Sequence, residues 1–182
     1  MMYKAELLKK YSLNIGLFGM ILLIIGVVVE AGSVFQKILF LIGALILTLV
    51  AYLDKQKMLL VLEIIITIGA ILAFYSRLSN LTKYSILLGL ATIGIGYLIK
   101  INYFRVDRFW PIGGLGLVGI AIGLATNALA NPVLFNASLG FGSILIAIYS
   151  AISFFYLKIK VSLIWLILNI IFAIKPLIVL FS

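Results

Sequence analysis

The chain has 182 residues, of which 65% are apolar and 10% are charged, and its formal net charge is +9. So few polar groups could not cover the surface of a water-soluble protein of this size, and the composition therefore predicts a single integral membrane domain. Cysteine and histidine are both absent. This excludes disulfides, thiol nucleophiles and the usual zinc and haem ligands. The basic residues fall between apolar runs, which is typical of contact with anionic lipid and not of nucleic-acid binding.

Seven apolar runs follow one another along the chain, and each is close to the roughly 20 residues that an α-helix needs to cross a bilayer. The alternating pattern of a membrane β-barrel is missing, so we expect an all-α protein with seven transmembrane helices. The first run is longer than the apolar part of a secretory signal, and we expect it to be retained. The runs cover residues 11–29, 34–53, 58–75, 84–99, 111–129, 139–156 and 161–181, and the fourth is the shortest.

Lysine and arginine are distributed unevenly between the joints that connect these runs. An excess of these residues marks the cytoplasmic side of a membrane protein. We therefore predict a cytoplasmic N-terminus and a C-terminus outside. With this orientation the inner segments hold ten basic residues and the outer segments three: Lys4, Lys9, Lys10, Lys55, Lys57, Lys100, Arg105, Arg108, Lys158 and Lys160 inside, and Lys37, Arg77 and Lys83 outside.

The first and fifth runs look like copies of one segment. Residues 14–31 and 111–128, at an offset of 97, share six of eighteen positions, four of which are glycine or alanine. The same offset pairs Gly43 with Gly140 and Tyr52 with Tyr149. Repeats in membrane proteins commonly enclose a central site between the two halves.

The offset moves the chain by four helices, an even number, so both halves must cross the membrane in the same direction. A unit of three helices is odd, and one linker helix is therefore needed between two parallel units. The sequence predicts a 3+1+3 internal repeat within one membrane domain, with an axis along the membrane normal. The first unit is residues 11–76, the linker is residues 84–99 and the second unit is residues 111–181.

Two segments carry a resemblance to a known superfamily. Residues 44–75 form an apolar helix, a tight basic turn and another helix, and residues 165–172 read WLILNIIF. They resemble parts of the SWEET sugar transporters and the PnuC-type transporters, whose half-length relatives are the SemiSWEET and PQ-loop proteins. The resemblance implies the same 3+1+3 fold and transport of a small solute between the halves. The chain has no Pro-Gln dipeptide, and its charge bias places the N-terminus inside, whereas SWEETs place it outside.

Polar residues in apolar runs are the first candidates for a site, because burying them in a bilayer is costly. Glu30 ends the first run, and the repeat places Asn127 at the equivalent point of the fifth. Together they could bind a cation or a polar substrate across the axis, or Glu30 could lie in the headgroup layer near Lys37. Glu63 lies about 1.5 turns into the third run. It could form an ion pair with Lys55 or Lys57, or serve as a carboxylate for proton or cation coupling.

The seventh run carries Trp165 and Asn169 on one helical face, at a spacing of i and i+4. An indole and an amide at that depth could bind substrate by stacking and hydrogen bonding, or they could hold helices together. The joint after the fourth run is basic and aromatic. Arg105, Arg108 and Trp110 are expected there as an anchor at the lipid interface, although docking of a cytoplasmic partner is an alternative.

Two functions follow from these features. The preferred one is a small-solute transporter without a cofactor, which binds substrate through Glu30, Asn127, Trp165 and Asn169, uses Glu63 for ion coupling and works by alternating access. The alternative is a non-catalytic integral subunit or scaffold of a larger membrane complex, with itself or other membrane subunits as partners. An enzyme is not expected, since neither paired acids nor a phosphate-binding loop is visible.

Overall fold

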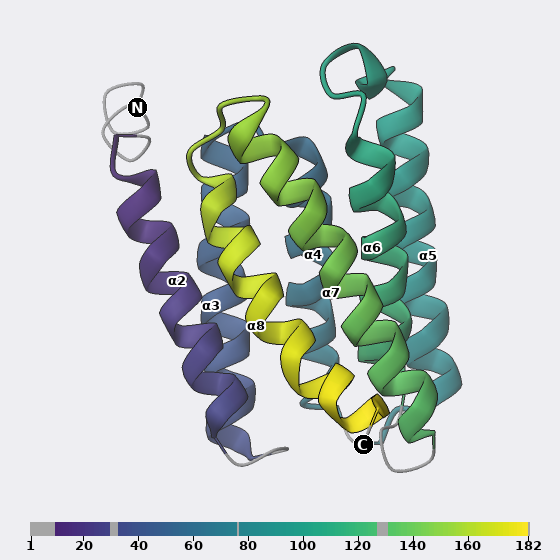
Figure 1. Ribbon diagram of the computed structural model, residues 1–182. Helices are drawn as coiled ribbons and strands as arrows, with labels where there is room; N and C mark the ends of the chain where they lie inside the picture. The colour runs from purple at the N-terminus through teal and green to yellow at the C-terminus, as the bar shows by residue number, and fades with distance from the viewer. Residues whose placement is uncertain (1–9, 30–32, 76, 127–130, 182) are drawn as a thin grey trace.

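The computed structural model describes residues 10–29, 33–75, 77–126 and 131–181. Within these residues the protein is all helical, with 84% helix and no strands. Its helices run up and down beside one another (Figure 1). They are α2 (Ser12–Val28), α3 (Val34–Leu53), α4 (Lys57–Leu72), α5 (Asn80–Lys100), the 3₁₀-helix η1 (Tyr103–Arg105), α6 (Trp110–Ala125), α7 (Pro132–Phe155) and α8 (Ser162–Phe181).

The seven α-helices lie on the seven predicted runs, but two of them begin four or more residues earlier than predicted. The fourth run is the shortest in the sequence, but the helix that contains it, α5, is not the shortest helix, because it has 21 residues and starts at Asn80. Ser79 caps it by accepting a hydrogen bond from the Thr82 backbone N–H at 3.1 Å. In the same way α7 starts at Pro132, after Asn131 accepts from the Leu134 N–H at 3.0 Å. The polar first turn of α5 interrupts the apolar run there, and Asn131, Asn136 and Ser138 interrupt it around the start of α7, so a search for apolar runs overlooks both starts.

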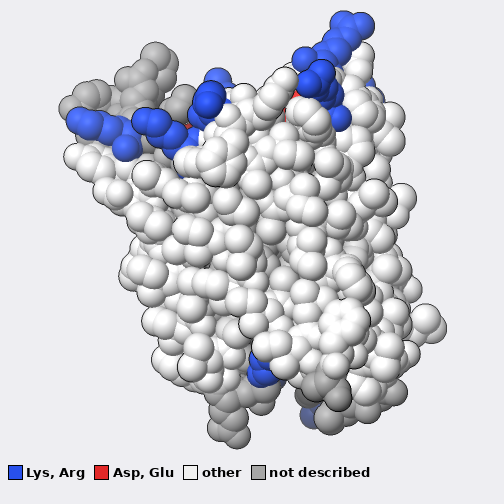
Figure 2. All heavy atoms as spheres, viewed as in Figure 1, with Lys and Arg blue, Asp and Glu red and all other residues white. Residues whose placement is uncertain are grey.

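Four helices are long and apolar enough to cross a membrane, namely α3, α5, α7 and α8, while α2 and α6 are shorter apolar helices. The visible face is a belt of apolar and uncharged side chains between two ends that carry the basic groups (Figure 2). We call the end at which α2, α4, α6 and α8 begin the basic end. It holds Lys10, Lys55, Lys57, Lys100, Arg105, Arg108, Lys158 and Lys160, and the other described basic residues lie toward the opposite end.

Six of the helices form a closed ring. In ring order α2 packs against α3, α3 against α4, α4 against α6, α6 against α7, α7 against α8, and α8 against α2. Helix α5 lies outside the ring, where it packs on α4, α6 and η1 (Figure 1). The ring therefore joins residues that are far apart in the sequence, since α2 and α8 are neighbours in space.

Glycines bring the backbones into contact at two of these interfaces. Between α2 and α3, a Cβ placed on Gly43 would lie 3.0 Å from the Gly19 carbonyl oxygen. Between α6 and α7, a Cβ on Gly142 would lie 3.0 Å from the Gly116 carbonyl oxygen. A larger residue at any of these positions would force the helices apart.

The structure does not support the two pairings that the offset of 97 predicted for the second helix of each unit. Gly43 faces α2, but a Cβ on Gly140 would instead meet Leu177 of α8. Tyr52 is 67% exposed, whereas Tyr149 is 1% exposed. The offset of 97 therefore does not extend from the first helix of each unit into the second.

Candidate functional site

The centre of the ring contains a hydrogen bond between two helices that are not neighbours in it. Glu63 lies in the second turn of α4 and Trp165 in the first turn of α8. The Trp165 indole N–H donates to Glu63 Oε1 at 2.6 Å, and both side chains are fully buried. Since α4 and α8 belong to different predicted units, this bond crosses the boundary between them. The cluster of Glu63, Trp165 and Asn169 is called the central site below.

Asn169 completes the central site one turn further along α8. It is 3% exposed, and its amide N–H donates to the Trp165 backbone carbonyl at 2.9 Å. This bond stays within α8, so it orients the amide without joining two helices. The structure thus places Trp165 and Asn169 on one buried face, as predicted, and adds Glu63 to them.

The second carboxylate oxygen of Glu63 is the least satisfied atom of the central site. Oε2 is buried and has no hydrogen-bond partner among the described residues. The ion pair considered for Glu63 is not formed with Lys55 or Lys57, although both are described, because Glu63 turns toward Trp165 instead. A buried acceptor without a partner loses its water without compensation, and this raises the free energy of the folded state.

No buried cation offsets this carboxylate in the part of the chain that the structure describes. The buried charged side chains are Glu63 and Asp107, and the other buried polar ones are serine, threonine or asparagine. Across the described ranges, no group of three or more His, Cys, Asp or Glu residues could hold a metal ion. The described interior can therefore compensate a positive charge, and it holds no cation that would pair with an anion.

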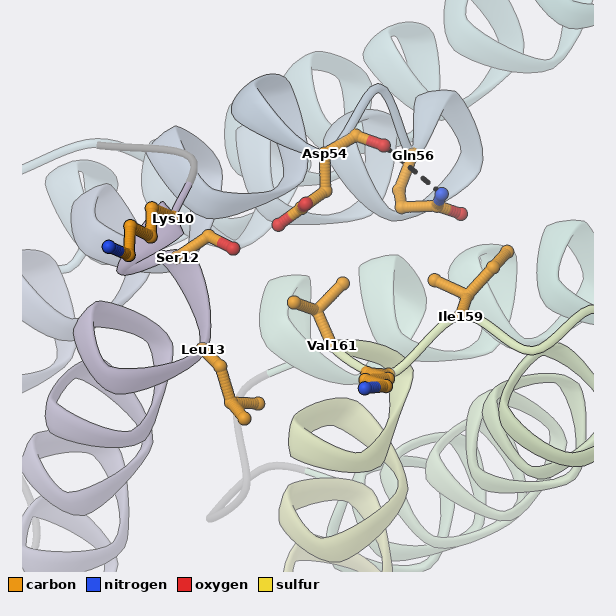
Figure 3. A pocket seen from close by; sticks show the side chains of 8 residues that line it. Lys10, Ser12, Leu13, Asp54, Gln56, Ile159 and Val161 are labelled. Carbon is orange, nitrogen blue, oxygen red and sulfur yellow. Dashed lines mark hydrogen bonds between the residues drawn. The ribbon is translucent and has the colours of Figure 1, made fainter. Parts of the chain in front are cut away.

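A water-accessible cavity of about 360 Å³ lies at the basic end, between the start of α2, the α3–α4 turn and the start of α8 (Figure 3). We call it the vestibule. Asp54 points into it toward Ser12, and Oδ2 of Asp54 has no hydrogen-bond partner among the residues described. The lining residues are Lys10, Ser12, Leu13, Asp54, Gln56, Ile159, Lys160 and Val161.

The vestibule lies directly above the central site along both helices. Gln56 at its wall directly precedes α4 and is seven residues before Glu63, a rise of about 10 Å at 1.5 Å per residue. Val161 at its floor immediately precedes α8 and is four residues before Trp165. The vestibule was not predicted from the sequence. The one feature of the sequence that could have indicated it is Asp54, an acid among the basic residues of the DKQK turn.

The basic and aromatic joint folds over the start of α6 and is fixed by Asp107. The Tyr149 hydroxyl donates to Asp107 Oδ2 at 2.7 Å, and the Phe109 backbone N–H donates to Oδ1 at 2.9 Å. Burial raises the pKa of the nearby Tyr103 phenol, and the Asp107 carboxylate raises it further. The joint is thus tied to α7 through a buried hydrogen bond.

The residues expected at the lipid interface are placed differently from one another. Arg105 and Arg108 are exposed, and the Arg108 guanidinium lies over the rings of Phe109 and Tyr156, at 4.8 Å and 5.7 Å from their centroids. Trp110 is 4% exposed and packs inside the protein. Only the two arginines of this set are therefore available to a lipid phosphate.

The remaining two predicted site residues, Glu30 and Asn127, lie outside the described residues. Comparisons of the chain with protein-family models, with curated proteins and with solved structures find no match. The functional argument therefore depends on the central site and the vestibule alone.

Proposed function

We propose that this protein is a multi-pass membrane transporter for a small solute that works by alternating access. The observation that carries the proposal is the buried Glu63 carboxylate of α4, which accepts a hydrogen bond from Trp165 of α8 and lies below a water-accessible vestibule. A buried group with an unsatisfied oxygen destabilises the protein, and such groups in membrane interiors are typical of transport pathways. A scaffold would gain stability from an apolar residue at this position.

The division into units α2–α4 and α6–α8, with α5 as the linker, is supported by the packing pattern. If the units are exchanged, the α2–α3 and α3–α4 contacts become α6–α7 and α7–α8, and the α4–α6 contact becomes α8–α2. All six contacts of the ring are thus reproduced. Five buried residues of α2 also have buried counterparts in α6 at the offset of 97: Gly16, Gly19, Met20, Leu23 and Gly26 correspond to Gly113, Gly116, Leu117, Ile120 and Gly123.

The proposal includes seven membrane crossings with the basic end in the cytoplasm. Four helices have the necessary length and hydropathy by themselves. The shorter α2, α4 and α6 are in the ring with α3, α7 and α8 and would cross with them. The gathering of basic residues at one end supports the orientation (Figure 2).

Alternating access would come from rocking of one unit against the other at the α2–α8 and α4–α6 interfaces. The vestibule opens on the first of these interfaces, so the described conformation corresponds to one that is accessible from the cytoplasm. The solute would contact Trp165 and Asn169, and Glu30 and Asn127 remain proposed contacts toward the opposite end. The resemblance to SWEET-type transporters, which rests on sequence and topology, agrees with this mechanism.

Uptake of labelled small solutes into proteoliposomes containing the purified full-length chain tests this proposal. For any solute that is taken up, we expect Asn169→Ala and Glu63→Gln each to reduce the initial rate at least 10-fold. Thr92→Ala, on the exposed face of α5, should leave the rate unchanged and serves as the matched control. Rates that are equal in all four proteins would refute the central site. A chain that purifies only in a fixed complex and takes up nothing would support the subunit alternative.

A further inference from the structure

The contacts of two equivalent glycines reveal how the remaining helices of the units correspond. A Cβ on Gly16 of α2 would meet Val50 of α3 and Ile164 of α8. A Cβ on Gly113 of α6, its counterpart, would meet Tyr149 of α7 at 3.0 Å and Met58 of α4 at 3.2 Å. Exchanging the units therefore pairs Val50 with Tyr149, an offset of 99, and Met58 with Ile164, an offset of 106.

The offset of 99 is reproduced by two further contacts between the first and second helices. Gly19 approaches Gly43 as Gly116 approaches Gly142, and 43 differs from 142 by 99. A Cβ on Gly26 would meet Phe40, while one on Gly123 would meet Leu139, and this difference is also 99. The second unit thus has two extra residues between its first and second helices.

The offset of 106 is reproduced by burial in the third helices. Six of the eight buried residues of α4 have a buried residue at this offset in α8. Glu63 corresponds in this way to Asn169, and Leu59 corresponds to Trp165. The other pairs are Met58 and Ile164, Leu62 and Leu168, Thr67 and Ala173, and Ala70 and Pro176.

Glu63 and Asn169 therefore occupy one position on the two units, facing the centre of the ring from opposite sides. The position carries an ionisable acid in the first unit and a neutral amide in the second. The pair therefore supplies one carboxylate, which can gain or lose one charge. The two-fold axis relates Trp165 to Leu59 and Glu63 to Asn169. The hydrogen bond from Trp165 to Glu63 therefore has no equivalent in the other half, because a leucine stands where a second indole would be needed to donate to Asn169.

The space at Glu63 limits what can bind there. Oε2 has almost no surface that a water-sized sphere can reach, so a hydrated ion or an organic cation does not fit beside it in this conformation. A metal ion would also need several oxygen ligands, and Glu63 is the only carboxylate of the central site. A proton needs neither space nor further ligands.

The helices packed around α4 and α8 place their titratable groups toward the two ends of the bundle. The polar side chain in contact with Glu63 is Trp165. The described titratable groups on α2 to α8, on their connections and directly before α2 are Lys10, Tyr11, Lys37, Tyr52, Asp54, Lys55, Lys57, Tyr75, Arg77, Lys83, Tyr84, Tyr97, Lys100, Tyr103, Arg105, Asp107, Arg108, Tyr149, Tyr156, Lys158, Lys160 and Lys175, besides Glu63 itself. Of these, Asp107 and Tyr149 are buried together and bonded to each other.

We propose that Glu63 binds and releases one proton in each transport cycle, that Asn169 is its neutral counterpart on the internal two-fold axis, and that Trp165 positions the carboxylate. A proton entering through the vestibule forms an O–H bond at the carboxylate and removes its charge, and the same bond breaks when the proton leaves. This inference rests on the proposed function, since it adds the coupling ion to the same site.

The experiment follows protonation directly and does not require the solute. In a Trp110→Phe background the remaining tryptophan emission comes from Trp165, which contacts Glu63. We expect this emission in the purified full-length protein to change with pH in one transition, together with the infrared C=O band of a protonated carboxyl group. Glu63→Gln should abolish both signals, and Asp54→Asn in the vestibule should keep both.

A swapped variant, in which α4 and α8 exchange these residues, tests the equivalence of the two units. Exchange of the four residues in Leu59→Trp, Trp165→Leu, Glu63→Asn and Asn169→Glu should restore the pH transition that Glu63→Asn alone loses. If the swapped variant does not fold, Glu63→Gln still decides whether the proton binds at Glu63. A transition that persists in Glu63→Gln, or one that appears on addition of sodium at constant pH, would overturn the proposal. A protein with the transition but without any solute uptake would keep the proton site and refute transport.

Discussion

Trp165 is the residue on which the central site depends, because it supplies the one hydrogen bond recorded to the Glu63 carboxylate. The chain offers an internal comparison in its other tryptophan. Trp110 is also buried, but its indole nitrogen has no hydrogen-bond partner among the described residues. The two side chains therefore separate the packing of a buried indole from its hydrogen bonding.

Replacement of each tryptophan by phenylalanine should give different losses of stability. In Trp165→Phe the Glu63 carboxylate loses its donor, and an unsatisfied buried acceptor costs about 1–3 kcal/mol. In Trp110→Phe only ring volume is lost, so we expect a smaller effect. Thermal unfolding in detergent measures the difference. A Trp110→Phe variant that is as destabilised as Trp165→Phe would show that the indole N–H of Trp165 contributes nothing.

At the level of helices, the glycines decide how closely the elements pack. A Cβ on Gly116 would lie 2.8 Å from the Gly142 carbonyl oxygen and 2.9 Å from the Ile146 backbone nitrogen. Backbone atoms cannot move aside as a flexible side chain can. Gly96 of α5, by contrast, has nothing within 4 Å of the position of a Cβ.

Alanine at these two positions should shift stability in opposite directions. We expect Gly116→Ala to destabilise the protein by about 1–3 kcal/mol, since α6 and α7 must separate. Gly96→Ala should be neutral or stabilising by up to about 1 kcal/mol, because alanine is the better helix former. The midpoint of thermal unfolding in detergent reports both. Equal effects would mean that the close contact of α6 and α7 is not required.

The sequence was sufficient for the helices and for part of the site. Apolar runs predicted α3 at its observed bounds, and α2 and α8 to within one residue at each end. The starts of α5 and α7 were missed because polar residues at and after the helix caps interrupt the apolar runs. The placement of Trp165 and Asn169 on one face followed from helical spacing. The bond to Glu63 could not be predicted, since it joins residues 102 positions apart through the closure of the ring.

The correspondence that we propose between α4 and α8 was beyond sequence comparison for a physical reason. Of the six pairs of buried residues in α4 and α8, only Leu62 and Leu168 are identical. Packing requires that equivalent positions be buried, but it does not require the same residue at each. The offset of 106 is therefore visible in burial and contacts and not in residue identity.

For the whole molecule, the arrangement in the membrane can be tested on one helix. The chain has no cysteine, so a single introduced thiol can be labelled without background. Asn80 and Lys100 are exposed at the two ends of α5. We expect Asn80→Cys to react with a membrane-impermeant maleimide from outside intact cells, and Lys100→Cys to react only after permeabilisation. The reverse pattern would invert the orientation, and labelling of both from outside would show that α5 does not cross.

The closure of the ring between α2 and α8 has a consequence for biosynthesis. Proteins emerge from the ribosome with their N-terminal parts first, and α8 is the last of these helices to be made. Until then α2 lacks its second neighbour in the ring, and Glu63 has passed into the nascent bundle without the indole that will bind it. A chain interrupted before residue 162 therefore lacks both the α8 neighbour of α2 and the indole that donates to Glu63.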